Sequence, residues 1–403
     1  MSLTEDSIPD DFIVGTATAA YQIEGSTRDG GRGRSIWDDF AATPGAIVDG
    51  STGDPADEHY VRYLDDVEIM SNLGLDAYRF SISWSRIQPD GTGPANPAGV
   101  AFYRRLAEAL IAKGITPYAT LYHWDLPSAL EGNGGWLNLE TADRFAEYTR
   151  LVVDSLGDLI THWITLNEPW CSAFLGYASG VHAPGKQLGS TATHAIHHLL
   201  LGHGRAVNNI RDSSPDATVG IALNLYSVEA ASNAKDDVDA ARRIDGLHNR
   251  LLLDPLLAGR YPADVLHDLG EETWFAANPL TDADEIAVPI DFLGINYYSR
   301  HTTTTGAPME TGASSYPAAN SSPWWIREPP KRSWAGRSTQ TVLSTSSAWP
   351  TRGSPTFLST SRRMAPLTTT RSSTTATSPT RNAATTSINT SPHAWKPYPS
   401  ASP

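Results

Sequence analysis

The feature that most limits the fold of this chain is a regular alternation of strand-like and helix-like segments, which continues to about residue 300. Six segments are apolar or β-branched and stop at Gly, Pro or polar residues, a pattern typical of strands. They start at Phe12, Asp76, Thr116, His162, Thr218 and Asp291. Six strand-then-helix units predict a parallel sheet, and near-continuous apolar strands predict that both of its faces are buried. We therefore expect an α/β protein of the (β/α)8 TIM barrel class.

The segments between these strands have the spacing of amphipathic helices. Phe102, Leu106 and Leu110 recur every fourth residue, and a glycine four positions later closes the pattern. Before the strand that starts at Asp76, apolar residues occur at every third position, namely Val61, Leu64, Val67 and Met70. Both patterns predict helices that pack beside the strands.

Polar residues gather where the predicted strands end. In parallel barrels the chemistry lies at the carboxyl ends of the strands. Those ends carry Gln22 with Glu24, Arg86, His123 with Asp125, Asn167 with Glu168, and Asn296 with Tyr298. Packing alone does not explain polarity at so many strand ends, so these residues are the candidates for a functional site.

Composition narrows the classes of partner. The net charge of -14 disfavours a nucleic acid or an anionic membrane surface. The opening MSLTEDSIPDD lacks the basic start and apolar run of a secretory signal, and no later stretch is long and apolar enough to span a bilayer. Cys171 is the only cysteine, so no intrachain disulfide or cysteine-based zinc site can form. We expect a cytoplasmic protein with a small-molecule substrate, and the sequence does not indicate an oligomeric state.

Five sequence motifs carry a family resemblance. TATAAYQIEG, YRFSISWSRI, YHWDLP, TLNEPW and GINYYSR occur in this order. Together they resemble glycoside hydrolase family 1, the family of retaining β-glucosidases, over about residues 8 to 317. The resemblance implies hydrolysis of terminal non-reducing β-D-glucosyl residues through a glycosyl-enzyme intermediate. Such chemistry uses carboxylates and needs no cofactor or metal.

The chemistry requires two carboxyl groups about 5 Å apart, one to protonate the departing oxygen and one to attack the anomeric carbon. The resemblance makes Glu168 the acid/base, and this residue must carry its proton until the glycosidic bond breaks. It also implies that Asn167 reaches the sugar 2-hydroxyl. The alternative is an ordinary Asn-Glu-Pro turn with a solvated glutamate.

The resemblance implies roles for further strand-end residues. It assigns substrate contacts to Gln22, His123, Trp124, Asn167, Asn296 and Tyr298, and it makes Arg79 and Tyr298 the pair that orients the nucleophile. Each of these could instead be a buried packing or ion-pair residue. The histidine-rich stretch THAIHHLLLGH, from Thr193 to His203, does not have clean metal-ligand spacing, so we expect a helix that faces the barrel and no metal site.

The second carboxylate is missing where the family has it. The family's nucleophile lies in a Thr-Glu-Asn-Gly run at the end of strand seven, and the corresponding stretch here, TFLSTSRRMAPLTTTRSS from Thr356 to Ser373, holds no acid. The 75 residues from Pro329 to Pro403 contain no Asp or Glu at all, and 31 of them are Ser or Thr. Taken literally, this composition is typical of a disordered segment.

A shifted reading frame would account for the tail. If each triplet starts one nucleotide earlier, Met364 followed by Ala365 must give Gly, and the codons before them permit Thr-Glu-Asn. The hypothesis is that one nucleotide was lost between about Pro317 and Trp324. Residues 1–318 are then an in-frame barrel with six strands, and residues 319–403 are an out-of-frame, Ser/Thr/Pro-rich tail.

Three functional readings follow. The first is a β-glucosidase by lineage that lacks its nucleophile and is inactive, with open sheet edges that predict aggregation. The second is a non-catalytic pseudoenzyme that binds sugars. The third, a different barrel hydrolase with the same Asn-Glu pair, fits the five motifs less well.

Overall fold

The computed structural model describes residues 12–277, 281–305, 316, 324–327 and 358–359, and these residues belong to one compact unit that spans Met1–Ser361. Within the predicted tail, 319–403, only β9 (Trp324–Arg327) and β10 (Leu358–Ser359) are described. The rest of that tail, including almost all of the stretch expected to hold a nucleophile, lies outside the described residues. The predicted domain boundary therefore stays a prediction.

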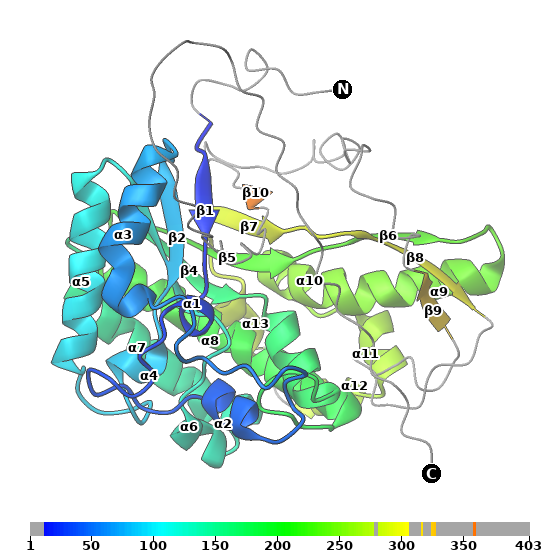
Figure 1. Ribbon diagram of the computed structural model, residues 1–403. Helices are drawn as coiled ribbons and strands as arrows, with labels where there is room; N and C mark the ends of the chain where they lie inside the picture. Colours follow the sequence, from blue (N-terminus) through cyan, green and yellow to red (C-terminus); the bar gives the residue numbers. More distant parts are fainter. Residues whose placement is uncertain (1–11, 278–280, 306–315, 317–323, 328–357, 360–403) are drawn as a thin grey trace, which may run out of the picture. The chain divides into compact units, whose positions relative to one another are not determined.

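A parallel sheet of seven strands forms the centre of the described unit (Figure 1). Its strands, in spatial order, are β1 (Gly15–Ala17), β2 (Ala77–Ser81), β3 (Thr116–Tyr122), β4 (His162–Asn167), β5 (Thr218–Asn224), β7 (Phe292–Asn296) and β10. The first six contain the six strands expected from the sequence, in chain order, as the barrel prediction requires. The two-residue β10 then pairs with β7, with Ser359 opposite Asn296. A separate three-stranded sheet contains β6 (Ser227–Ala230), β8 (Arg300–Thr305) and β9.

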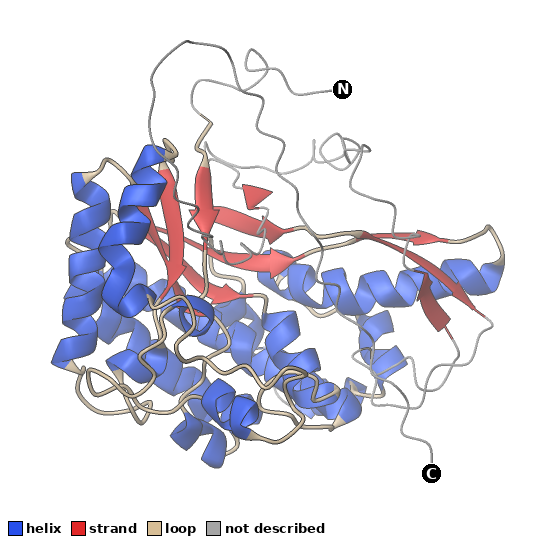
Figure 2. Cartoon of the chain, viewed as in Figure 1, coloured by secondary structure: helices blue, strands red, loops and turns tan. Residues whose placement is uncertain are grey.

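Helices alternate with the strands and lie along the sheet (Figure 2). The α-helices are α1 (Ala20–Ile23), α2 (Ile36–Ala42), α3 (His59–Asn72), α4 (Trp84–Ile87), α5 (Pro97–Ala112), α6 (Ser128–Gly132), α7 (Glu140–Leu156), α8 (Ala192–Ser213), α9 (Lys235–Asp245), α10 (Leu251–Ala258), α11 (Ala263–Leu269), α12 (Glu272–Ala277) and α13 (Thr281–Ile286). Short 3₁₀ turns cover Gly135–Leu137 and Gly189–Thr191, and π-helical segments cover Cys171–Ala178 and Gly246–Arg250. Helix α5 packs on β3, and α8 packs on β4 and β5.

Helix α5 shows how local sequence sets these boundaries. Asn96 caps its start by accepting a hydrogen bond from the backbone N–H of Ala98, and Pro97 occupies the first helical position, where its missing N–H costs nothing. Gly114 follows the helix with φ of +73°, a conformation that glycine adopts without strain. The residues spaced every fourth position, Phe102, Leu106 and Leu110, are fully buried.

The three-residue repeat in α3 predicts a helix correctly, but its apolar residues do not share one face. Val67 and Met70 are buried, whereas Val61 and Leu64 are 62% and 59% exposed. Each residue of an α-helix turns by 100°, so three residues turn by 300° and an every-third pattern drifts around the helix. Val61 and Met70 therefore point in opposite directions.

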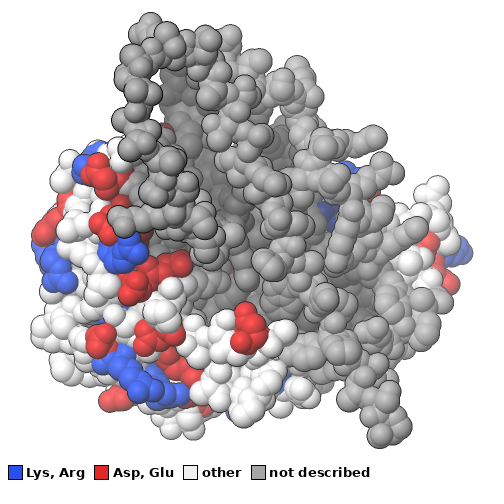
Figure 3. All heavy atoms as spheres, viewed as in Figure 1, with Lys and Arg blue, Asp and Glu red and all other residues white. Residues whose placement is uncertain are grey.

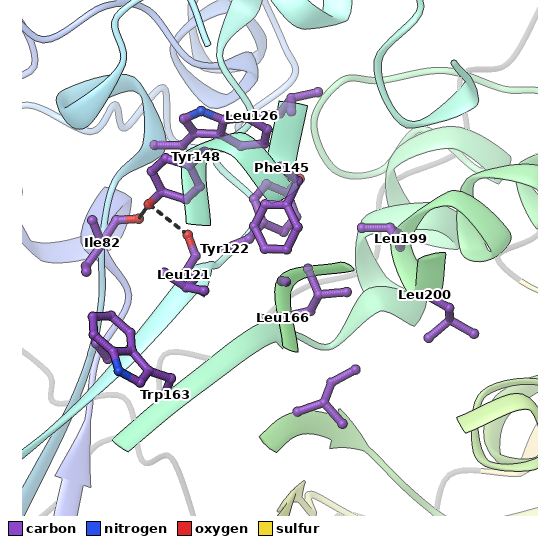
Figure 4. Packing of buried hydrophobic residues seen from close by; sticks show 14 of the residues in the cluster. Ile82, Leu121, Tyr122, Leu126, Phe145, Tyr148, Trp163, Leu166, Leu199 and Leu200 are labelled. Atoms are coloured by element: carbon purple, nitrogen blue, oxygen red, sulfur yellow. Dashed lines mark hydrogen bonds between the residues drawn. The ribbon is translucent and has the colours of Figure 1, made fainter. Parts of the chain in front are cut away.

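The core between sheet and helices holds the ends of the early strands in place (Figure 4). Tyr148 of α7 is completely buried, and its hydroxyl lies 3.2 Å from the carbonyl oxygen of Ile82 and 3.1 Å from that of Leu121. Trp163 and Leu166 of β4 are also fully buried. Side-chain packing and this forked contact thus support the strand ends from which the polar residues emerge.

The described surface carries mixed charge. Figure 3 shows acidic and basic side chains interspersed over the visible described surface. Several form ion pairs, such as Arg104 with Asp158 and Lys113 with Glu68. Within the described ranges, every helix is too short or too polar to cross a bilayer.

Candidate active site

Four strands of the parallel sheet, β2, β3, β4 and β7, bring the predicted site residues together. Strand β2 carries Arg79, β4 ends at Asn167, and β7 ends at Asn296. His123 directly follows β3, and Glu168 directly follows β4. Because all these strands run parallel, their ends lie on one rim and their side chains converge on its centre.

Glu168 is the most enclosed carboxylate at this rim. It is 3% exposed. Its Oε1 accepts hydrogen bonds from Asn296 Nδ2 at 2.5 Å and from the Tyr298 hydroxyl at 3.1 Å, and its Oε2 accepts one from the Cys171 thiol at 3.3 Å. Three donors thus contact its two oxygens. The group is therefore held in position from both sides.

Two residues of the site have strained backbone conformations. Glu168 has φ of +48° and Trp124 has φ of +79°, in the left-handed region that side chains other than glycine seldom adopt. Such strain persists only where the surroundings enforce it, and it is found most often at functional sites. In this case it turns both side chains at the ends of β3 and β4.

Asn167 is the centre of a second set of contacts. Its Oδ1 accepts from Arg79 Nη2 at 2.6 Å and from Asn296 Nδ2 at 3.1 Å, and its Nδ2 lies 2.9 Å from His123 Nε2. Its carbonyl oxygen accepts from the indole N–H of Trp124 at 2.9 Å. An amide N–H can donate only to an unprotonated ring nitrogen, which makes His123 neutral with its proton on Nδ1. Burial, together with the charge of Arg79, holds the pKa of His123 well below its usual range.

Arg79 contacts only neutral groups directly. Its Nε donates to Thr120 Oγ1 at 2.9 Å, and its Nη2 donates to Asn167. Burial lowers the pKa of Arg79 to about 10, and the charges of Glu168 and Tyr298 act in the opposite direction. No carboxylate of the described residues forms an ion pair with this guanidinium.

The remaining predicted sugar contacts lie at the edge of the site. Gln22 is exposed in α1. The Trp124 ring stacks near Trp37, with centroids 6.5 Å apart and planes at 24°, and His182 lies 5.4 Å from both rings. Flat aromatic rings of this kind are suited to stacking on the apolar face of a sugar.

Glu24, Arg86 and Asp125 were expected at strand ends, but they lie directly after α1, within α4 and three residues past β3, and outside the contacts of Glu168. Glu24 accepts from Arg86 Nε at 2.9 Å and from the Tyr103 hydroxyl at 2.6 Å, all within the core. Asp125 is 1% exposed, and neither carboxylate oxygen has a hydrogen-bond partner in the described structure. Burial raises the pKa of Asp125 to about 7, helped by the charge of Glu24 and opposed by Ser83 and Arg32.

Sequence reasoning missed the role of Cys171 as a neighbour of Glu168. The thiol is buried, and besides donating to Glu168 it lies 3.4 Å from Asn224 Nδ2. The spacing of three residues from a predicted catalytic glutamate, in a segment that turns helical, was the available indication.

The histidines of α8 point to different neighbours. His194 Nε2 lies 3.0 Å from Glu271, His198 Nδ1 lies 2.9 Å from the carbonyl oxygen of Trp136, and His203 Nδ1 lies 2.7 Å from Thr165 Oγ1. The described residues contain no group of three or more His, Cys, Asp or Glu side chains that could hold a metal ion. Each histidine is thus accounted for by packing and hydrogen bonding in a helix that covers β4 and β5.

The parallel barrel sheet and its buried strand-end carboxylate define a class, the barrel hydrolases that act with carboxyl groups. Residues 4–341 match the family model "Glycosyl hydrolase family 1". Beta-glucosidase A of Acetivibrio thermocellus is 46% identical over 312 residues, which are 77% of this chain and 70% of that protein. Beta-glucosidase A of Thermotoga maritima is 48% identical over 294 residues, 73% of this chain and 66% of that protein. The chain belongs to glycosyl hydrolase family 1.

Solved structures agree with this assignment. The family 1 β-glucosidase from Thermotoga maritima in complex with isofagomine lactam has a TM-score of 0.72 and 46% sequence identity, over 74% of this chain and 68% of that one. The fold is therefore the family's (β/α)8 barrel, of which the described residues supply strands one to six and the short β10. The chain spans about two thirds of the length of the relatives it matches.

Proposed function

We propose that this chain is a retaining β-glucosidase by lineage that carries the acid/base half of the catalytic pair. One observation carries the proposal: Glu168 is buried at the end of β4, and Asn296, Tyr298 and Cys171 hold both of its oxygens. A carboxyl group fixed in this way can deliver a proton to a glycosidic oxygen in a defined direction. The relatives named beta-glucosidase support the substrate class, a small β-glycoside.

In the proposed reaction, Glu168 protonates the oxygen of the leaving group while a second carboxylate attacks the anomeric carbon. Water then releases the sugar, with Glu168 now taking the proton. Asn167, His123 and Trp124 are proposed to contact the bound sugar, and Gln22 to join them from the edge. We also propose that the second carboxylate belongs in the region where this chain reads TFLSTSRR, from Thr356 to Arg363, and has no acid.

The test is to restore the reading frame. One base inserted between the codons for Pro317 and Trp324 should create the Thr-Glu-Asn-Gly run and yield an enzyme that hydrolyses 4-nitrophenyl β-glucoside. The present chain, assayed in parallel, should remain near background. A restored chain that folds, as judged by circular dichroism and a cooperative melt, but does not release nitrophenol would refute the proposal.

A second candidate is a sugar-binding protein without catalysis. The observation in its favour is the absence of any Asp or Glu from residues 329–403, which leaves Glu168 without the partner that cleavage requires. Isothermal titration of the present chain with deoxynojirimycin, a ligand of one structural relative, separates the two candidates. Saturable binding by the unrestored chain favours the binding protein, and a cytoplasmic location is part of both proposals.

A further inference from the structure

Strand β4 leaves its regular pairing with β5 just before the candidate site. Ile164 pairs with Gly220 and Asn167 pairs with Ala222, so β4 advances three residues while β5 advances two. On its other side, β4 keeps equal steps with β3. One extra residue of this kind is a β-bulge, which re-aims side chains and is common beside active sites. The irregularity therefore lies between β4 and β5, directly before Glu168.

The bulge changes the face of the sheet to which the side chains of β4 point. In a regular strand, residues two apart share a face. Thr165 contacts His203 of helix α8. Asn167, two residues later, instead accepts a hydrogen bond from Arg79 of β2 within the site. A one-residue shift of pairing moves side chains to the opposite face, so the bulge turns Asn167 away from α8 and toward the site.

The hydroxyl of Thr165 connects β5 and α8 at the bulge. Its Oγ1 donates to the carbonyl oxygen of Gly220 at 3.3 Å and lies 2.7 Å from His203 Nδ1. A hydroxyl has one hydrogen, so with that hydrogen on Gly220 its oxygen accepts from the Nδ1–H of His203. This tautomer leaves only an acceptor, Nε2, without a partner in the described structure, whereas the other tautomer would bury an unpaired N–H. His203 thus holds the hydroxyl of Thr165 over Gly220.

The surroundings of His203 suit a fixed hydrogen-bond donor. The residue is fully buried in α8, which packs on both β4 and β5. Burial lowers the pKa of His203 to about 3, so the ring is neutral at neutral pH and keeps a single N–H. Burying a polar ring is unfavourable, and the hydrogen bond to Thr165 offsets part of that cost. His198 of the same helix lies instead 2.9 Å from the carbonyl oxygen of Trp136, outside the sheet.

We propose that His203 is a positioning residue for Glu168, on which it acts through Thr165 and the bulge in β4. The backbone after the bulge completes the connection, because the N–H of Glu168 donates to the carbonyl oxygen of Ala222 at 2.8 Å and its φ is +48°. Among the described contacts, His203 does not touch Glu168 itself, so its effect is indirect. The inference rests on the proposed function in one respect, that Glu168 is the proton donor.

The experiment compares variants of the full chain that keep or remove this connection. Thr165→Val removes the hydroxyl and keeps the shape, whereas Thr165→Ser keeps the hydroxyl. His203→Leu removes the donor, whereas His203→Asn keeps an N–H near the position of Nδ1. The matched control is His198→Leu, which removes a buried histidine of the same helix. Hydrogen–deuterium exchange of single backbone amides measures local opening, and urea unfolding measures global stability.

The expected result is a local loss of protection at the amide of Glu168. In Thr165→Val and His203→Leu this amide should exchange about tenfold faster relative to the amides of β3, the upper range for one buried hydrogen bond. Thr165→Ser and His203→Asn should keep most of the protection, and His198→Leu should not change the ratio.

Two outcomes overturn the proposal. The amide of Glu168 exchanges as in the unchanged chain, or exchange rises equally at Glu168 and in β3. Either result makes His203 an ordinary core residue. Thr165→Val alters the core volume little, so the pair of Thr165 variants decides the matter even if a His203 variant does not fold.

Catalysis gives a second measurement in the frame-restored enzyme. Thr165→Val and His203→Leu should lower kcat for an alkyl β-glucoside, whose leaving group needs a proton, more than for a dinitrophenyl β-glucoside, with little change in KM. A loss of folded protein lowers both rates by the same factor, and equal losses would overturn the connection to Glu168. A restored but unsubstituted enzyme without activity would refute the proposed function, whereas the exchange measurement needs no activity and tests the bulge separately.

Discussion

Arg79 and Arg86 are seven residues apart in the sequence, but Arg86 has a carboxylate partner among the described residues and Arg79 does not. The partners of Arg86, namely Glu24 and Tyr103, come from the first half of the sequence, and every donor and acceptor among them is satisfied in the core. Arg79 has two neutral partners and Glu168 at a distance. The difference teaches that the polar cluster around Arg86 is complete within the first half of the chain, whereas we propose that the cluster around Glu168 depends on a group from the end of the chain.

The largest expected effect is on catalysis, once frame restoration has supplied the missing carboxylate to the cluster around Glu168. In the frame-restored enzyme, Glu168→Gln should lower kcat for an alkyl β-glucoside by roughly 10²–10⁴-fold, since the leaving group then departs without a proton. A dinitrophenyl β-glucoside, whose leaving group needs no proton, should lose much less in the glycosylation step. Steady-state kinetics on both substrates measure the difference.

The matched control is Glu140→Gln, which removes an exposed carboxylate on α7 that pairs with Arg144. Equal losses on both substrates in Glu168→Gln would contradict the acid role.

The next largest expected effect is the loss of stability when the Arg86–Glu24 ion pair is broken. Arg86→Gln leaves Glu24 buried without its ion-pair partner, and such a loss typically costs about 3–5 kcal/mol of unfolding free energy. Urea unfolding followed by tryptophan fluorescence measures the change. Arg104→Gln, which breaks an exposed pair, should cost less than about 1 kcal/mol. If both variants lost equal stability, the buried cluster would not have the role assigned to it.

Asp125 provides the corresponding test for a negative charge, because it is a buried carboxylate without a hydrogen-bond partner in the described structure. Its pKa in the folded protein, about 7, lies above that of an unfolded aspartate. The folded protein therefore holds the proton more tightly, and stability falls as pH rises from about 4 to about 7. Asp125→Asn should remove this loss and stabilise the protein by about 2–4 kcal/mol at pH 8, with almost no effect at pH 4. Urea unfolding at several pH values measures it, and a benefit that did not change with pH would count against a buried charge.

Arg79→Gln should have the smallest effect on stability. The change gives up hydrogen bonds to Thr120 and Asn167 but also removes a buried charge without an ion-pair partner, so the two terms nearly cancel. We expect the unfolding free energy to stay within about 1 kcal/mol of the unchanged chain or to rise slightly, in contrast to Arg86→Gln. A loss of 3 kcal/mol or more, on the scale of a broken buried pair, would show that Arg79 is already compensated.

Most of the fold could be predicted because apolar strands and turn residues are local features. All six expected strands form, in chain order, and the four-residue spacing in α5 identified a buried face correctly. The every-third pattern in α3 did not identify a buried face. An α-helix has 3.6 residues per turn, so residues spaced by three do not stay on one face. Val61 and Leu64 are exposed for that reason.

The residues of the candidate site could be predicted from the sequence, but the hydrogen bonds between them could not. Its residues could be placed at strand ends from sequence, and the structure brings Glu168, Asn167, His123, Arg79 and Asn296 within one hydrogen-bond network. Which atoms meet could not be predicted, since contacts across strands depend on register and on side-chain rotamers. Tyr298, expected to orient a nucleophile, donates instead to Glu168, and its expected role stays a prediction.

The spatial order of the first five strands repeats their order along the chain, and each pairs with the strand before it. During translation, a nascent chain can therefore attach every new strand to an edge that has already left the ribosome. An error late in the message reaches the polypeptide only after the residues of those strands have been synthesised. A gene with a frameshift near its 3′ end would thus still encode the N-terminal strands and the contacts between them.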